Sequence, residues 1–159
     1  MNFLRMLTAA TLVFAVSAPV AFAGGHGGNP AVSARKAHMQ LYQHNLVILG
    51  SMARGRVDYD AEAAQAAADN LVALTQLSQA GYWVPGTTNA DLGDATRLLP
   101  ALFEDGGFAR AIEIGGNTAA AAQNLAAVAG DGQAALGPAV GALGQSCNTC
   151  HEAFQQARN

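Results

Sequence analysis

The stretch Cys147-Asn148-Thr149-Cys150-His151 lies close to the end of a chain of 159 residues and decides how the rest is interpreted. Two cysteines three positions apart, followed directly by a histidine, form the attachment signature of c-type haem. On a helix both thiols project from one face about a turn apart, so each reaches one vinyl group of the same porphyrin edge. His151 follows Cys147 by four residues and projects from that side, as an axial iron ligand does. The pattern predicts one covalently attached haem c.

Three other kinds of site use cysteines with this spacing. A redox dithiol normally lies where a helix begins, because the positive end of the helix dipole lowers the thiol pKa. Here the cysteines lie near the end of a long helical pattern. A tetrahedral zinc site needs four ligands, and the chain contains only these two cysteines. A disulfide across so short a helical stretch is strained. Haem attachment is therefore the favoured interpretation.

The first 23 residues have the features of a secretory signal peptide. Arg5 supplies a positive start, residues 7–20 form an apolar run, and Ala21-Phe22-Ala23 is a small-x-small cleavage site. The apolar run is too short for a membrane anchor. We therefore expect residues 1–23 to be a signal peptide and residues 24–159 to form one domain, soluble and periplasmic after export, with no membrane span.

Composition narrows the class of protein further. The formal net charge is -3 and only 12% of the residues are charged, which argues against a nucleic-acid partner. The chain after the signal is rich in Ala and Leu and has few β-branched runs, which favours an all-α domain. Both cysteines belong to the haem motif, so no disulfide framework is expected.

Start and stop signals predict two helices in the first half of the domain. One runs from Asn29-Pro30 to about Arg54, and the next is capped by Asp60 and ends near residues 79–81. The first helix carries two stripes, which implies contact with more than one neighbour, within a bundle or across a dimer. The stripes are Val32, Arg35, Met39, Tyr42, Leu46 and Leu49, and His38, Leu41, Asn45, Ile48 and Met52; the second helix has Ala64, Ala67, Leu71 and Leu74.

The second half begins with turn residues. Residues 82–99 are expected to form a long loop that wraps a haem edge. A third helix is expected over residues 100–129, with a kink or break where Gly106-Gly107 or Gly115-Gly116 weakens it. Asp131 is the expected cap of a fourth helix, whose inward stripe is Leu136, Val140, Leu143, Cys147, Cys150 and Phe154. Four such helices predict an antiparallel up-down-up-down four-helix bundle.

With these features in place, the chain resembles the class II c-type cytochromes, the cytochrome c-prime family. The haem motif lies near the C-terminus, where this class carries it. Other matching features are Arg35, Met52-Ala53-Arg54-Gly55, Tyr59-Asp60, Trp83-Val84-Pro85-Gly86-Thr87 and Pro100-Ala101-Leu102-Phe103.

The resemblance implies haem held between the helices of an antiparallel bundle and a homodimer formed through the first two helices. It also implies a periplasmic protein that carries electrons between redox partner proteins, or one that binds nitric oxide and carbon monoxide. An enzyme is not expected, because no distal acid–base pair is visible in the sequence.

The family's site residues carry over to matching positions. Cys147 and Cys150 correspond to the thioether positions and His151 to the axial ligand. Arg35 corresponds to an arginine near a haem propionate, an anion that needs a cationic donor. Lys36 is a candidate for the second propionate.

Met39 falls at the position that faces the distal side of the iron. In high-spin members of the family this residue is a blocker that does not ligate, and in low-spin relatives a methionine here coordinates the iron. Thioether sulfur is a competent sixth ligand, and methionine is also common core filler. Six-coordinate iron favours electron transfer, and five-coordinate iron leaves a hindered pocket for small gases.

Further candidates surround this position. Trp83 and Phe154 are expected either to pack on the haem or to belong only to the core. His38 and His44 are rival ligands that we do not expect to bind iron, because both are predicted at partly exposed helix positions.

One position departs from the family pattern. Gln155 stands four residues after His151, where the family commonly has a basic residue, so a cation beside the proximal face is missing from that position. Arg158 is expected to replace it in part if the final turn curls back. Arg97 is a further propionate candidate, with a solvated loop arginine as the alternative.

Overall fold

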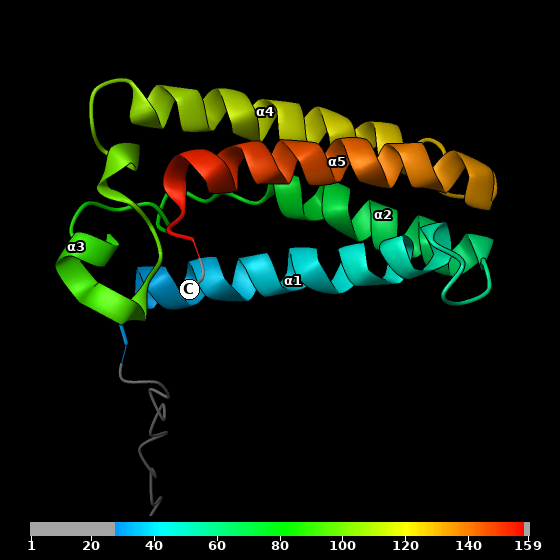
Figure 1. Ribbon diagram of the computed structural model, residues 1–159, viewed down its shortest axis with the longest axis horizontal. Coiled ribbons are helices and arrows are strands. Elements are labelled where there is room, and N and C mark those ends of the chain that lie inside the picture. The colour runs from blue at the N-terminus through cyan, green and yellow to red at the C-terminus, as the bar shows by residue number, and fades with distance from the viewer. Residues whose placement is uncertain (1–27, 158–159) are drawn as a thin grey trace, which may run out of the picture.

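The computed structural model describes residues 28–157, in which the long helices form an antiparallel bundle (Figure 1). These helices are α1 (Pro30–Ala53), α2 (Ala61–Gln76), α4 (Gly107–Ala126) and α5 (Gln133–Phe154). Helix α1 packs against α2, α2 against α4, α4 against α5, and α5 against α1, so the four close into a ring. The predicted all-α four-helix bundle is confirmed.

Two of the sequence expectations fall outside this part of the chain. The signal peptide at residues 1–23 and Arg158 lie outside the described residues. Across residues 28–157, no helix has both the length and the apolar character needed to cross a bilayer.

The caps of the first two helices follow the sequence signals. Asn29 Oδ1 accepts from the backbone N–H of Ala31 and Val32 at the start of α1, and Asp60 Oδ1 accepts from Ala63 N–H at the start of α2. Helix α2 ends at Gln76, earlier than predicted. The Thr75 hydroxyl donates to the Val72 carbonyl at 2.6 Å, a side-chain bond that competes with continuation of the helix.

The long connection contains more structure than predicted. Within it lie a short helix α3 (Asn89–Leu92) and a 3₁₀ turn η1 (Gly93–Ala95). The third predicted helix is also divided, into a 3₁₀ turn η2 (Pro100–Leu102) and α4. Gly106 has a φ of 77°, and a Cβ on Gly107 would lie 2.0 Å from the Ala101 carbonyl oxygen. Only glycine fits this close reversal, so the break occurs here and α4 runs unbroken through Gly115-Gly116.

The start of α5 corrects a second expectation. Asp131 was expected to cap this helix, but α5 begins at Gln133 and Gly132 occupies the preceding position with a φ of 111°. This left-handed backbone favours glycine and delays the helix by one residue. Pro138 lies inside α5, and the helix continues past it to Phe154.

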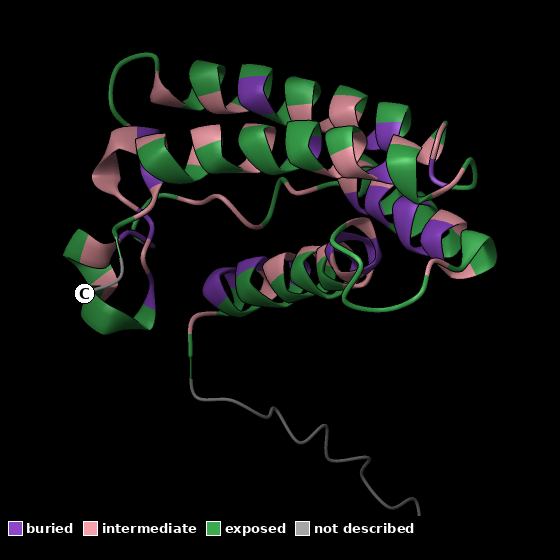
Figure 2. Ribbon diagram, turned by 45° about the vertical axis from the view of Figure 1, so that its right-hand side comes forward, coloured by how far each residue is buried: buried purple, intermediate pink, exposed green. Residues whose placement is uncertain are grey.

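The buried interior is divided into two clusters. Figure 2 shows buried residues, in purple, along the helices of the bundle and in the long connection. The large cluster fills the end of the bundle away from α3 and consists of Leu49, Met52, Ala64, Ala67, Ala68, Leu71, Ala122, Leu125, Ala129, Leu136 and Leu143. The small cluster lies beside the long connection and consists of Leu98, Leu102, Ile114 and Phe154. Cys147 packs against the large cluster and Cys150 against the small one. The predicted inward stripe of α5 is therefore confirmed, and its cysteines lie where the two clusters meet.

Tyr59 joins two connections at the end of the bundle that holds the large cluster. Its hydroxyl donates to the Ala129 carbonyl at 2.7 Å and accepts from Gly132 N–H at 3.0 Å. The α1–α2 connection is thereby held against the turn between α4 and α5.

A Tyr59→Phe variant is expected to lower the free energy of unfolding by about 1–3 kcal/mol, because it leaves two partly buried backbone groups without their partner. Denaturant unfolding of the holoprotein measures this loss. Tyr82→Phe is the matched control, since no hydrogen bond of the Tyr82 hydroxyl is present among residues 28–157. Equal losses in both variants would contradict a role for the Tyr59 hydroxyl.

Candidate haem-binding site

The three residues of the haem motif lie on the last two turns of α5. Cys147 and Cys150 are half-buried and face the bundle interior, whereas His151 is exposed. The thiols thus point into the interior that a porphyrin would fill, and the imidazole lies at the outer edge of the same helix end. The structure places all three residues at the end of one helix, and the role of His151 as iron ligand stays a prediction.

The thiols do not have the character of a redox dithiol. Burial raises the pKa of Cys147. Burial is also the main cause that raises the pKa of Cys150, and the nearby Cys147 is the second cause. A catalytic dithiol requires a lowered pKa so that thiolate is available near neutral pH. Within residues 28–157, moreover, no group of three or more His, Cys, Asp or Glu side chains could hold a metal ion. The raised pKa values of the two thiols therefore argue against a redox dithiol at this position.

Arg35 is buried on the inner face of α1, with 6% of its surface exposed. Its guanidinium donates to the Tyr82 carbonyl at 2.6 Å, to Thr87 Oγ1 at 2.9 Å, to the Thr87 carbonyl at 3.0 Å and to Thr96 Oγ1 at 3.1 Å. It also lies over the Trp83 ring, 5.4 Å from the ring centroid. All four acceptors belong to the connection between α2 and α4, so Arg35 fastens that connection to α1.

The charge of Arg35 is only partly compensated by these contacts. Burial lowers the pKa of the guanidinium, and its hydrogen-bond partners in residues 28–157 are all neutral. A buried cation without an anionic partner is costly, so an anion brought by a cofactor would be stabilised here. The arrangement fits a haem propionate, and the role of Arg35 toward it stays a prediction.

His38 corrects a sequence expectation, because it is buried rather than partly exposed. Only 3% of its surface is accessible, and its Nε2 is a buried atom with no hydrogen-bond partner among the described residues. Its ring lies 4.8 Å from the Tyr42 ring and 5.6 Å from the Tyr82 ring. Burial lowers the pKa of His38, and this effect outweighs a hydrogen bond with the Leu74 backbone, which raises the pKa. The helical period placed His38 on a stripe, but did not show that α2 and the long connection cover it.

Tyr42 is a residue whose closeness to the haem motif the sequence did not reveal. The pKa of Tyr42 is raised to about 12, mainly by burial and secondly by the neighbouring Cys147. The phenol therefore lies next to the first thioether position, and its ring links that position to His38. Its place on the predicted inner stripe of α1 was the available signal.

Met39 lies half-buried on α1, one turn beyond Arg35. It belongs to neither of the two core clusters formed by the described residues. Whether Met39 ligates the iron or only blocks its distal side stays a prediction. His44 is exposed on the outer face of α1, as expected.

The remaining candidates are divided between the interior and the surface. Trp83 is half-buried, packs against the small cluster with Phe154, and donates from Nε1 to Gln79 Oε1 at 3.1 Å. Lys36 is exposed on α1. Trp83 is thus held beside the haem motif by its contacts, whereas the structure gives Lys36 no fixed partner within residues 28–157.

Arg97 lies against the end of α5. Its Nε donates to the Gln156 carbonyl at 2.8 Å, and its Nη2 donates to Gln155 Oε1 at 3.3 Å and also to the Gln156 carbonyl. The pKa of His151 is lowered mainly by partial burial and secondly by the positive charge of Arg97. A cation therefore does lie near His151 despite Gln155, and it comes from the long connection rather than from the last helix.

The described residues fit a covalently attached haem c. The site offers two half-buried thiols at the meeting point of two apolar clusters, an exposed imidazole beside them, and a buried cation without an anion. Cys147 and Cys150 would hold the porphyrin, His151 would bind its iron, and Arg35 would face a carboxylate. The bound group would supply one-electron chemistry at the iron.

An Arg35→Lys variant is expected to loosen the long connection, because an ammonium cannot reproduce the forked bonds of the guanidinium. We expect the free energy of unfolding to fall by about 2–4 kcal/mol and residues 82–99 to become more sensitive to limited proteolysis. Arg54→Lys, the same change at an exposed position, is the control. Unchanged proteolysis in Arg35→Lys would contradict the fastening role.

The chain is similar to known proteins of one family. The family model for Cytochrome C' matches residues 30–155. Cytochrome c' of Cereibacter sphaeroides is 34% identical over 155 residues, which cover 98% of this chain and 100% of the relative. Cytochrome c-554 of the same organism is 36% identical over 126 residues, covering 79% and 80% of the two chains.

The fold is also similar to that of a solved structure. Cytochrome c' from Rhodobacter sphaeroides superimposes with a TM-score of 0.75 at 35% identity, covering 80% of this chain and 96% of that one. The fold, the haem motif on its last helix and the match over nearly the whole described chain show that this protein belongs to the cytochrome c' family and carries a covalently attached haem c.

Proposed function

We propose that this protein is a periplasmic electron-transfer protein that exchanges single electrons with redox partner proteins and has no enzymatic activity. The observation that carries the proposal is the position of Cys147, Cys150 and His151 on the last two turns of α5. A haem attached at the end of a helix lies close to the protein surface, so electrons have a short route to a partner. Export through residues 1–23 is part of this proposal, because that stretch has the features of a secretory signal.

The proposed sixth ligand of the iron is Met39. Its thioether takes no part in either core cluster, and Arg35, one turn before it, is held by four hydrogen bonds. Thioether ligation raises the reduction potential and closes the iron to exogenous ligands. Such an iron suits electron transfer.

Binding of small gases is the second candidate function. If the Met39 sulfur does not reach the iron, the site is a hindered five-coordinate haem. A solved cytochrome c prime variant from Alcaligenes xylosoxidans with bound NO is 26% identical, covers 80% of this chain and 94% of its own, and has a TM-score of 0.67. That similarity makes nitric oxide and carbon monoxide the ligands to test.

The reduced protein is expected to show a sharp low-spin optical spectrum that carbon monoxide does not alter. Met39→Leu is expected to give a high-spin spectrum that responds to carbon monoxide and a lower reduction potential, because the thioether ligand is lost. We expect the reduction potential of Met39→Leu to be lower by at least a tenth of the roughly 0.8 V range over which axial ligands set haem potentials. Spectroscopy with a potentiometric titration measures both.

Met52→Leu is the control for that experiment, because Met52 is a buried member of the large cluster. Its spectrum should match that of the unsubstituted protein. Unchanged spectra in Met39→Leu would rule out ligation. A response of the unsubstituted protein to carbon monoxide would favour the gas-binding function instead.

We also propose that the protein forms a homodimer through α1 and α2. Leu41 on α1 and Leu77 just after α2 are 51% exposed each. Asn70 Nδ2 donates to Asn45 Oδ1 at 3.1 Å, which sets the antiparallel register and places both leucines at the same end of the helix pair. A related cytochrome c', 26% identical with a TM-score of 0.70 and covering 80% of this chain and 95% of its own, shows ligand-controlled dimer dissociation.

Leu41→Asp is expected to raise the dimer dissociation constant by about a hundredfold or more, because both copies lose a buried leucine and gain a charge. Sedimentation equilibrium of the holoprotein measures the constant. Ile112→Asp is the matched control, since Ile112 is 64% exposed on α4 and lies outside the helix pair. A dimer weakened by the Ile112 change and not by the Leu41 change would place the interface elsewhere.

A further inference from the structure

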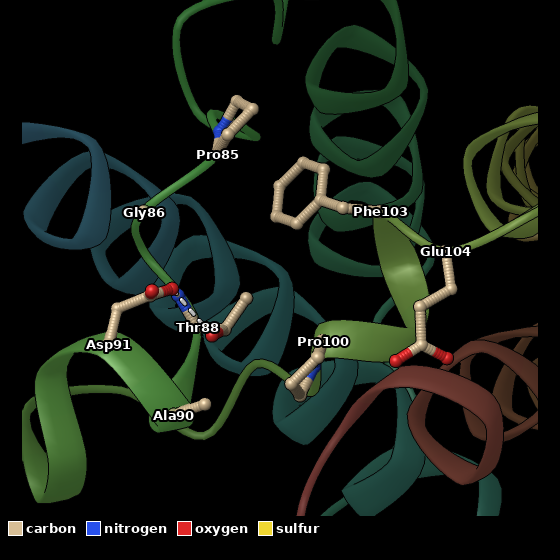
Figure 3. A pocket seen from close by; sticks show the side chains of 8 residues that line it. All are labelled: Pro85, Gly86, Thr88, Ala90, Asp91, Pro100, Phe103 and Glu104. Carbon is tan, nitrogen blue, oxygen red and sulfur yellow. Dashed lines mark hydrogen bonds between the residues drawn. The ribbon is translucent and has the colours of Figure 1, made fainter.

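A pocket of about 290 Å³ opens between the long connection and η2, and no residue of the haem motif lines it (Figure 3). Pro85, Pro100 and Phe103 form its apolar walls, and Thr88, Asp91 and Glu104 supply its polar groups. The Phe103 ring extends into the space near Pro85, and Asp91 and Glu104 lie on opposite sides of it. A pocket lined by an aromatic ring and two carboxylates is a setting for a cation.

The pocket carries negative charge that the described residues do not neutralise. Asp91 Oδ2 accepts from Thr88 N–H at 2.9 Å and from Thr88 Oγ1 at 2.6 Å. The hydrogen bond from the Thr88 side chain is the main cause that lowers the pKa of Asp91, and the bond from the Thr88 backbone is the second. The Asp91 carboxylate is therefore ionised near neutral pH. Asp91 Oδ1 and the Glu104 carboxylate have no hydrogen-bond or ion-pair partner within residues 28–157, and no basic residue lines the pocket.

The shape of the pocket selects among cations. A bare metal ion could use the carboxylates but would gain nothing from the Phe103 ring and the two proline rings, which offer it no oxygen ligands. A lysine side chain has an apolar stem that can lie along these walls and an ammonium head that can reach the carboxylates. Such a side chain matches both the apolar and the charged part of the lining.

We propose that this pocket receives a lysine side chain from the protein with which the haem exchanges electrons. The proposal rests on the electron-transfer function proposed above. Two observations point to a protein rather than a free amine. The carboxylates are exposed, so a free amine would gain little from pairing with them, whereas a lysine presented by a docked surface is held at high effective concentration.

The second observation is the position of the pocket relative to the haem motif. Phe103 packs against the small cluster, and Cys150 packs against the same cluster. A partner whose lysine enters the pocket is therefore linked to the second thioether position through the side chains of the small cluster. Docking here would bring the partner close to the haem.

The test uses ferric holoprotein labelled with fluorophenylalanine. Residues 28–157 contain the phenylalanines Phe103, Phe108 and Phe154, so Phe108, exposed on α4 outside the pocket, is an internal control. The probe is a short peptide containing one lysine between glycines, with the same peptide acetylated on that lysine as its comparison. We expect a weak but saturable shift of the Phe103 fluorine signal at high concentrations of the lysine peptide, because the peptide lacks the rest of the partner surface, and we expect the shift to weaken with added salt.

Variants locate the binding. Glu104→Gln is expected to weaken peptide binding about threefold, since the pair is exposed, and Phe103→Leu to weaken it by a similar factor in calorimetry. Glu113→Gln removes an exposed carboxylate of α4 outside the pocket and should leave binding unchanged. Equal weakening by Glu104→Gln and Glu113→Gln would overturn the site.

Three other outcomes would also overturn the proposal. One is equal binding of the acetylated peptide, which would show that the ammonium is not recognised. Another is a shift of Phe103 by spermidine as strong as that by the lysine peptide, which would assign the pocket to free polyamines. The last is peptide binding to a protein whose haem binds carbon monoxide and does not exchange electrons with hexaammineruthenium(III). In that case the electron-transfer function fails while the pocket still binds lysine.

Discussion

The burial of one guanidinium governs the haem end of this molecule. Arg35 can leave water only if its donors find acceptors, and all the acceptors it finds belong to the connection between α2 and α4. The folded position of that connection and the burial of Arg35 are therefore one event. Because the same connection carries Trp83 and leads to the small cluster, the walls around the haem motif depend on this single side chain.

The sequence was sufficient for the features that are local or strictly periodic. The cap at Asn29, the cap at Asp60 and the inward stripe that includes Cys147 and Cys150 all depend on residues within a few positions of one another. Residue type and spacing determine such features almost alone, since each is satisfied within one helix. The haem motif belongs to this class, which is why its placement on the last helix could be predicted.

Other features depend on contacts between distant segments, and here the sequence was insufficient. His38 was expected to be partly exposed because its own helix does not cover it, but α2 and Tyr82 do. The cation near His151 was sought in the last turn and is supplied by Arg97, 54 positions earlier in the chain. The break at Gly106 was among the expected positions, yet the choice was made by the close approach of Gly107 to Ala101.

The division of the core explains why a prosthetic group belongs to the fold rather than being added to a finished one. The large cluster is continuous through α1, α2, α4 and α5, while the small cluster is held mainly by the connection and the end of α5. The cysteines lie where the two meet, so a porphyrin bound to them would extend the apolar interior from one cluster to the other. It would also bring anionic groups into a region where Arg35 is a buried cation among neutral partners. Attachment of the haem would therefore join the two apolar clusters and give the buried cation of Arg35 an anionic partner at once.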